Sequence, residues 1–342
     1  MRRPTLEDVA RRAGVSRSTV SRVINGEPGV SAEVAERARK AVAELGYVPN
    51  QAARRLVTHR SGAVAVVVTE PRRRLFVDPV FDGLLHGIRG ELLRHGAQLV
   101  LLFVEEDDDY ARVAHFLSGG HVDGALLFSL RADDPLPGMI DRLDLPAVFG
   151  GRPVLGPGRW GRGHTYVGAD DRGGAAEAVR HLRSLGRRRI GTITGPLDQV
   201  SSLDRLDGYR DVLPDAPPRM VVEGDYSREG GADAMAVLLG RCPDLDAVFV
   251  ASDKMASGAL QVLRERGRAV PEDVAVVGFD DLASIAEATD PPLTTVRQDT
   301  EEMGRLMARL LFDDTRDDRG APAGRAPASV VTPTRLVLRK SA

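Results

Sequence analysis

The stretch TLEDVARRAGVSRSTVSRVIN, residues 5–25, decides the fold of the N-terminal part of this chain. Thr5, followed by Asp8 three residues later, has the spacing of a capping box, which marks the start of a helix. Gly14 favours a turn, because glycine adopts left-handed backbone dihedrals with little strain. Ser16 can then cap a second helix through its hydroxyl group. The pattern therefore predicts two short helices joined by a tight turn.

The second of these helices has two different faces. Val20, Val23 and Ile24 recur at the spacing of a buried helical stripe. The opposite face carries the polar side chains of Arg17, Ser18, Ser21 and Arg22. A helix that presents arginine and serine after a glycine turn is typical of a helix-turn-helix, whose second helix lies in the major groove of DNA. A surface helix pair within a larger domain is the alternative interpretation.

The distribution of charge separates the beginning of the chain from the rest. The 342 residues have a formal net charge of −2, but residues 1–60 alone carry 12 Lys or Arg against 6 Asp or Glu. The remaining residues carry 35 Lys or Arg against 43 Asp or Glu, so a basic head precedes an acidic body. Only the head is therefore expected to meet a polyanion such as DNA.

Composition and cysteine content narrow the class of protein. Hydrophobic residues make up 42% of the chain, which indicates globular domains. No apolar run is long enough for a membrane span, and the N-terminus lacks the apolar segment of a signal peptide. Cys242 is the only cysteine, which excludes an intrachain disulfide. We therefore expect a cytoplasmic protein without a membrane partner, associated with the nucleoid through its head.

A third helix and a short segment follow the helix pair. Ser31 can cap a helix over residues 32–45. Pro49 interrupts the chain before residues 50–56, a helix-prone segment that is too short to be stable alone in water. The segment should fold only against DNA or a twin segment, and Leu56 would then act as a wedge in the minor groove. A flexible linker is the alternative interpretation.

From residue 62 onward, apolar strand-like runs alternate with helical stretches. Continuous apolar strands separated by helices indicate parallel sheets that are covered on both faces. We therefore predict a body of two doubly wound α/β lobes. Ligands of such sheets bind beyond the carboxyl ends of the strands, which here are residues 69–74, 129, 150–152, 194–196, 252–253 and 279–281.

Catalytic and metal-binding patterns are absent from the sequence. It has no phosphate loop, zinc-binding HExxH pair or nucleophile elbow, and its histidines lack the spacing of metal ligands. The adjacent acids Asp280 and Asp281 have no visible nucleophile or metal partner. We interpret Asp280 as a carboxylate that binds ligand hydroxyls and Asp281 as the cap of the next helix. The sequence thus predicts no enzyme, no catalytic residue, no metal and no cofactor.

Residues 5–62 resemble the DNA-binding head of the LacI/GalR family of bacterial transcription regulators, through the motifs TLEDVARRAGVSRSTVSRVING and ELGYVPNQAARRL. By this resemblance Arg17 and Ser18 read base edges, and the segment from residue 50 is a hinge helix in the minor groove. Arginine suits bidentate contact with guanine, and hydroxyl groups suit phosphates, so the chemistry agrees. The residues predicted to bind DNA are Thr5, Ser16, Arg17, Ser18, Thr19, Ser21, Arg22, Asn25, Asn50, Ala53, Arg54 and Leu56.

The body resembles the effector-binding core of the same family, which is similar to periplasmic sugar-binding proteins. FVDPVFDGLLHGI, DRLDGYRD, VFVASDKMASGAL and VPEDVAVVGFDDL are among the motifs that carry this resemblance. It implies that Arg205 clamps a ligand and that Tyr226 packs against it. With the strand-end rule, it gives the predicted ligand-binding residues Asp78, Phe81, Ser129, Arg205, Tyr226, Ser252, Asp253, Asp280 and Gln298. An aromatic face with carboxylates and one arginine suits a polyhydroxylated ring.

The sequence also departs from the family pattern near these residues. Ser252 replaces an asparagine that is common before Asp253, and Asp171 stands where asparagine is frequent. The loop around Trp160 is longer than usual. The resemblance therefore implies a ligand cleft without identifying the ligand.

These observations predict three parts: a helix-turn-helix head at residues 1–49, a hinge helix and linker at 50–61, and an effector-binding core at 62–342. The first lobe of the core is expected at 62–166 and 297–328, and the second at 167–296 and 329–340. The organisation predicts a homodimeric repressor of a pseudo-palindromic operator in double-stranded DNA, controlled by a small-molecule effector, most simply a sugar. The alternatives are a regulator that responds to a nucleobase or another non-sugar metabolite, and a sugar-binding module without a regulatory role.

Overall fold

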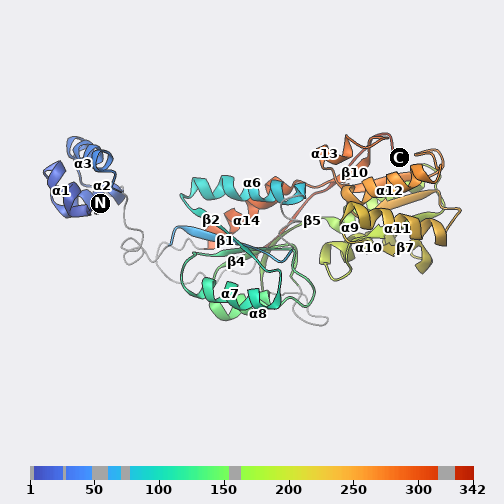
Figure 1. Ribbon diagram of the computed structural model, residues 1–342, viewed down its shortest axis with the longest axis horizontal. Helices are drawn as coiled ribbons and strands as arrows, with labels where there is room; N and C mark the ends of the chain where they lie inside the picture. The colour runs from blue at the N-terminus through green and yellow to red at the C-terminus, as the bar shows by residue number, and fades with distance from the viewer. Residues whose placement is uncertain (1–3, 26–27, 48–60, 71–77, 154–162, 315–327) are drawn as a thin grey trace. The chain divides into compact units, whose positions relative to one another are not determined.

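The computed structural model describes residues 4–25, 28–47, 61–70, 78–153, 163–314 and 328–342. The chain divides into two compact units, Met1–Ser61 and Gly62–Ala342 (Figure 1). The described part of the first unit is α-helical, and the second unit contains two α/β lobes. The predicted fold class is therefore confirmed. Residues 50–60, which include the predicted hinge helix, lie outside the described residues.

The head consists of three helices, α1 (Leu6–Ala13), α2 (Arg17–Asn25) and α3 (Ala32–Leu45). Gly14 ends α1 in the left-handed conformation with φ of 65°, which a larger side chain would adopt only with strain. The three helices share one small apolar core around the fully buried side chains of Val9, Val20 and Ala38. The predicted helix–turn–helix arrangement is thus confirmed.

The first lobe contains a six-stranded parallel sheet in the order β11-β5-β4-β3-β1-β2. Helices α6 and α14 lie on one side of this sheet, and α7 and α8 lie on the other (Figure 1). The strands are β1 (Ala63–Val68), β2 (Gln98–Phe103), β3 (Ala125–Phe128), β4 (Ala147–Gly150), β5 (Thr165–Ala169) and β11 (Ser329–Thr332). The helices are α6 (Pro79–Arg94), α7 (Asp107–Ser118), α8 (Leu136–Leu143) and α14 (Thr300–Asp314).

The second lobe contains a six-stranded sheet in the order β12-β10-β9-β8-β6-β7, in which the pairing of β12 with β10 is antiparallel and the others are parallel. Separate apolar clusters fill its two faces, one with α9 and α10 and the other with α11 and α12. The strands are β6 (Ile190–Thr194), β7 (Val221–Glu223), β8 (Ala247–Val250), β9 (Ala275–Asp280), β10 (Thr294–Arg297) and β12 (Arg335–Val337). The helices are α9 (Asp171–Ser184), α10 (Val200–Val212), α11 (Arg228–Arg241), α12 (Asp253–Glu265), α13 (Ala283–Ala286) and a 3-10 turn, Pro218–Met220.

The structure corrects the predicted boundary between the lobes. Of residues 329–340, expected in the second lobe, β12 does pair with β10 there, but β11 pairs with β5 in the sheet of the first lobe. The strand β5 itself extends to Ala169, beyond the expected end of the first lobe at residue 166. A strand of four or five residues contains no local information about which sheet it joins, because that depends on distant hydrogen-bond partners.

Candidate functional site

The polar face of α2 is a candidate DNA-reading surface. The side chains of Ser16, Arg17, Ser18 and Arg22 are exposed, whereas Val20 is fully buried on the opposite side. Ser16 forms the N-terminal cap of α2, and its hydroxyl oxygen accepts a hydrogen bond of 3.1 Å from the Thr19 backbone amide. The hydroxyls of Ser18 and Thr19 each lie 2.8 Å from that of Ser16. Thr19 and Ser21 are half-buried, and Asn25 is the last residue of α2.

Thr5 and Arg17 also have partners within the head. The Thr5 hydroxyl donates to Asp8 Oδ2 at 2.7 Å and accepts from the Asp8 amide, which is the predicted capping box of α1. Arg17 Nη1 lies 3.8 Å from Glu7 Oε1, and both side chains are about 70% exposed. Such an exposed pair contributes little to stability, so the guanidinium remains free to exchange partners. Asn50, Ala53, Arg54 and Leu56 lie outside the described residues.

A cavity in the second unit brings together eight of the nine predicted ligand-binding residues, all except Asp253. Its volume of about 170 Å³ far exceeds the roughly 10–15 Å³ that a single water molecule needs, so it can hold a small organic ligand. The lining residues are Asp78, Val80, Phe81, Leu84, Phe128, Ser129, Gly150, Gly151, Gly168, Ala169, Asp171, Gln199, Ser201, Arg205, Tyr226, Ser252, Lys254, Asp280, Gln298 and Met303. Five of them lie at strand ends that the sequence analysis named: Ser129, Gly150, Gly151, Ser252 and Asp280.

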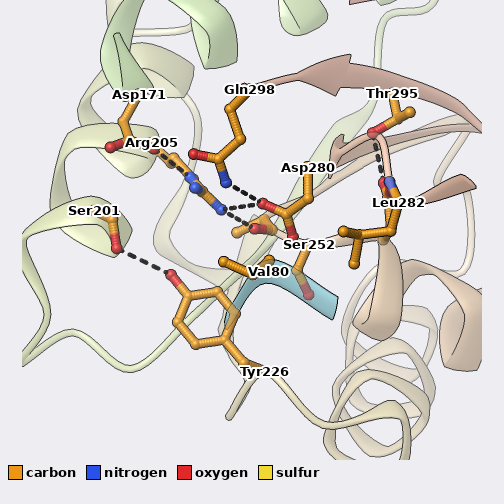
Figure 2. Close-up of polar contacts among 12 residues, drawn as sticks. Val80, Asp171, Ser201, Arg205, Tyr226, Ser252, Asp280, Leu282, Thr295 and Gln298 are labelled. Atoms are coloured by element: carbon orange, nitrogen blue, oxygen red, sulfur yellow. Dashed lines mark hydrogen bonds and ion pairs between the residues drawn. The ribbon is translucent and has the colours of Figure 1, made fainter. Parts of the chain in front are cut away.

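Arg205, on α10, is the centre of a buried polar network in this cavity (Figure 2). Its Nε donates to Asp171 Oδ1 at 2.7 Å, and its Nη1 donates to the backbone oxygen of Ala251 at 2.6 Å. Asp280 Oδ1 lies 3.5 Å from the same Nη1 and accepts a hydrogen bond of 2.7 Å from Gln298 Nε2. The guanidinium also lies 3.7 Å from the centre of the Phe279 ring. These contacts hold the arginine in one position before any ligand arrives.

The electrostatics of this network raise the pKa of one carboxyl group, that of Asp280, to a value near neutral pH. Burial, against the opposing effect of Arg205, raises the pKa of Asp280 to about 7, and the nearby carboxylate of Asp78 adds to the rise. Burial likewise raises the pKa of Asp171, although Arg205 opposes this effect. Burial alone would lower the pKa of Arg205, but Asp171 and Asp280 outweigh it and keep the arginine charged. A carboxyl group that titrates near pH 7 can donate a hydrogen bond to a sugar hydroxyl when it is protonated and accept hydrogen bonds from sugar hydroxyls when it is ionised.

Tyr226 provides an aromatic wall next to this network. It is buried, has a positive φ of 63°, and lines the cavity. Its hydroxyl shares a hydrogen bond of 2.7 Å with Ser202 and lies 3.5 Å from the hydroxyl of Ser201. A Cβ atom at Gly195 would lie 2.1 Å from this ring, so the ring position requires glycine there. The ring can therefore pack on an apolar sugar face without losing its own partner.

The first lobe contributes a more apolar wall. Phe81, Leu84, Phe128 and Met303 line the cavity from α6, β3 and α14. Asp78 caps α6 through a hydrogen bond of 3.2 Å from the Val80 amide to Asp78 Oδ1. Ser129, after β3, also lies in this wall and has a φ of 60°.

Asp253 does not line the cavity, contrary to its predicted ligand-binding role. It is fully buried, accepts a hydrogen bond of 2.8 Å from the Leu282 amide, and accepts another from the Thr295 hydroxyl. Both carboxylate oxygens are therefore used within the fold. Asp281 also departs from the prediction: its side chain pairs with Arg297 and Arg339 and does not cap α13.

Four polar residues of the cavity were missing from the predicted set: Asp171, Gln199, Ser201 and Lys254. Gln199 donates a hydrogen bond of 2.9 Å to Glu70 Oε1, which joins the second lobe to the first. Lys254 Nζ lies 3.5 Å from Asp78 Oδ2 and also joins the two lobes. Lys254 follows the predicted strand end at residues 252–253 by one position, so a slightly wider strand-end rule would have included it.

Two further observations on the described residues concern metal binding and membrane spans. The described part of the chain has no cluster of three or more His, Cys, Asp or Glu side chains that could hold a metal ion. None of the helices described is long and apolar enough to cross a membrane. The cavity instead offers paired charges, hydroxyls, amides and aromatic faces, which are groups suited to reversible binding of a polyhydroxylated molecule.

Comparison with known proteins relates both parts of the chain to regulators. Residues 5–50 match the family model of bacterial regulatory proteins of the lacI family, and residues 179–342 match that of the periplasmic binding protein-like domain. The HTH-type transcriptional regulator CelR of Thermobifida fusca is 47% identical over 344 residues, covering 99% of this chain and 98% of the relative. The ribose operon repressor of Escherichia coli K12 is 34% identical over 315 residues, covering 90% and 92%, respectively.

Solved structures of transcriptional regulators are also similar to this chain over almost its whole length. A complex of the transcriptional regulator CelR with cellobiose has a TM-score of 0.77 and 46% identity, covering 99% of this chain and 100% of that one. The Lac repressor dimer bound to operator and the anti-inducer ONPF has a TM-score of 0.85 and 30% identity, covering 99% of each chain.

Proposed function

Because this chain belongs to the lacI family of bacterial regulatory proteins, we propose that it represses transcription under the control of a sugar held between its two lobes. Like these relatives, it is a DNA-binding transcriptional regulator and not an enzyme. The observation that carries the proposal is the cavity itself, in which Arg205, Asp280 and Gln298 form a prearranged polar network opposite an apolar wall. Such a combination recognises a ring with hydroxyl groups on its rim and apolar faces.

The effector that we propose is a short β-linked glucoside, with cellobiose as the first candidate. A regulator 46% identical to this chain forms a complex with cellobiose, and eight of the nine residues predicted to bind a ligand line the cavity here. Asp280, whose pKa is raised to about 7, would exchange hydrogen bonds with ring hydroxyls, and Tyr226 would pack against a ring face.

On the DNA side, we propose that two heads of a homodimer read the half-sites of a pseudo-palindromic operator. The exposed face of α2, with Arg17, Ser18 and Arg22, supports this role. The remaining predicted DNA contacts, including the hinge residues from Asn50 to Leu56, are part of the same proposal. The protein would act in the cytoplasm, in association with the nucleoid.

Isothermal titration calorimetry with cellobiose, supported by thermal shift, tests the proposed effector. A ligand that binds only the native state raises its melting temperature by an amount that grows with ligand concentration. We expect saturable binding and a raised melting temperature with cellobiose, and weaker effects with maltose and glucose. Binding of hypoxanthine with no response to any sugar would overturn the sugar assignment and favour a nucleobase effector.

A further inference from the structure

Lys254 and Asp78 form an ion pair that joins the two lobes inside the cavity. Lys254 is the second residue of α12 in the second lobe, and Asp78 is the N-terminal cap of α6 in the first lobe. Their closest charged atoms are 3.5 Å apart, and both residues line the cavity. The side chains are only 19% and 9% exposed, respectively. This lysine is therefore part of the ligand-binding surface, although the predicted site did not include it.

The position of Lys254 is unfavourable for the helix that carries it. The first turn of a helix has a partial positive charge from its aligned peptide dipoles, which repels a lysine and attracts an acid. The first residue of α12, Asp253, offers little compensating charge, because burial raises the pKa of its carboxyl group well above the usual value and so favours the neutral form. A residue placed against the local preference of its helix indicates a role outside the helix.

The ammonium group of Lys254 retains capacity to bind another partner. It has three donors, and the described contact with Asp78 is longer than the roughly 2.7–2.9 Å of a charge-assisted hydrogen bond. Arg205 differs in this respect, because its short hydrogen bonds to Asp171 and Ala251 hold it within the fold. Of these two cations in the cavity, Lys254 is therefore the better placed to donate new hydrogen bonds to a ligand.

Lys254 also lines a second cavity. The second cavity, of about 440 Å³, has Lys254 in its wall together with Arg228, Ser257, Leu260 and Arg264. Because Lys254 lines both cavities, an alanine substitution would change the shape of the effector site as well as its charge. A methionine keeps the stem volume and removes only the ammonium group.

We propose that Lys254 is a specificity-determining residue of the effector site, which donates hydrogen bonds to hydroxyl oxygens of the sugar while Asp78 holds its ammonium group in the cavity. This inference rests on the proposed function, since it assigns a ligand contact within that site. The same contact explains how one ligand engages both lobes: the sugar binds an α12 side chain whose ionic partner belongs to α6. A simple structural link between the lobes, without a ligand contact, is the competing explanation.

Three variants separate these two explanations by calorimetric titration with cellobiose. Asp78→Asn breaks the ion pair but keeps a side chain that caps α6 well. Lys254→Met is made alone and in combination with Asp78→Asn. If Lys254 contacts the sugar, the double variant binds about 10- to 100-fold more weakly than Asp78→Asn, as expected for a lost hydrogen bond to a charged group. If the pair only links the lobes, adding Lys254→Met to Asp78→Asn changes nothing further, and the inference is overturned.

A matched control comes from another ion pair between the lobes. Arg131 and Asp198 are 2.9 Å apart, but their side chains are 53% and 38% exposed and neither residue lines the cavity. We expect Arg131→Gln to change the affinity for cellobiose by no more than about twofold. A loss equal to that of Lys254→Met would mean that any link between the lobes has this effect, which also overturns the inference.

A series of monodeoxy cellobioses provides a second test that does not depend on Asp78. For at least one position, removal of the sugar hydroxyl should weaken binding to the wild type and not to Lys254→Met. If removal of each sugar hydroxyl weakened binding equally in the wild type and in Lys254→Met, a direct contact between Lys254 and the sugar would be contradicted. If the wild type binds no sugar at all, the proposed effector class fails. If the wild type binds and the variants match it, only the role of Lys254 fails.

Discussion

The head and the body of this protein present their polar side chains in opposite ways. On α2 the side chains of Arg17, Ser18 and Arg22 are exposed, and the ion pair of Arg17 with Glu7, at 3.8 Å, is weak. In the body Arg205 is buried and has short contacts with Asp171 and Ala251. An exposed surface can adapt to a polyanion, whereas a buried network positions a small ligand. The difference implies that substitutions in the head affect binding alone, while those in the cavity affect binding and stability together.

The largest effect is expected from Arg205→Met in the body. The substitution leaves the buried carboxyl groups of Asp171 and Asp280 without their cation, which costs about 3–5 kcal/mol for a broken buried pair. Urea unfolding followed by circular dichroism measures this cost, and sugar binding should be lost as well. Arg131→Gln, at an exposed ion pair, serves as the control and should change stability by less than about 1 kcal/mol. Equal small effects of both substitutions would remove the distinction between buried and exposed polar side chains on which the comparison of body and head depends.

The second-largest effect is expected from Asp280→Asn, which should change how the stability of the protein depends on pH. The pKa of Asp280 is about 7 in the folded protein against about 3.9 in an unfolded chain, so the native state binds more protons between these values. Its contribution to stability is therefore fully present below about pH 4 and is lost as the pH rises towards 7. Relative to the wild type, the variant should gain stability over this range, by at most about 4 kcal/mol. Melting temperatures of both proteins from pH 4 to 8 test this, and a constant difference would contradict the raised pKa.

A smaller effect, confined to binding, is expected from Arg17→Ala in the head. Loss of a bidentate base contact costs about 1–3 kcal/mol of discrimination between operator and other DNA. The urea unfolding curve should not change, because Arg17 is exposed and its pair with Glu7 is weak. Gel-shift titrations on operator and scrambled DNA at the same salt concentration measure the difference. An equal loss on both sequences would make Arg17 a phosphate contact instead of a base reader.

The smallest effect is expected from Thr5→Ala. Thr5 forms the capping box of α1 with Asp8, and loss of such a cap costs about 1 kcal/mol. This stability effect would be an exception to the rule that head substitutions affect binding alone, because Thr5 already has a partner within the head. Hydrogen exchange of the α1 amides provides the measurement, and unchanged protection would show that the cap contributes nothing.

The sequence predicted most of the fold because its signals are local. The apolar run of β1 and the capping residues of α1 and α3 depend on neighbours within a few positions. The membership of β11 in the first sheet was not predictable in this way, since it depends on pairing with β5, far away in the chain. Pairing between distant strands is fixed by the tertiary fold and not by the propensity of either strand.

Most of the ligand-binding residues were also predicted from the sequence, and the prediction failed where a residue's role depends on distant partners. The strand-end rule and the family resemblance located Arg205, Asp280 and Gln298 in one cavity. They could not show that both carboxyl oxygens of Asp253 accept hydrogen bonds from Leu282 and Thr295, because these contacts depend on side-chain geometry. The importance of Lys254 likewise appears only when α6 of the other lobe places Asp78 beside it.

A regulator of this kind requires that the cavity and the head are coupled, and operator binding measured with and without cellobiose shows whether they are. The operator would be selected from random duplexes by the protein itself, and binding followed by fluorescence anisotropy at about 150 mM salt. We predict that saturating cellobiose changes the dissociation constant for the operator by roughly 5- to 150-fold, the usual range of allosteric coupling, and leaves binding to scrambled DNA unchanged. Identical operator affinity with and without bound cellobiose would mean that the cavity and the head are not coupled.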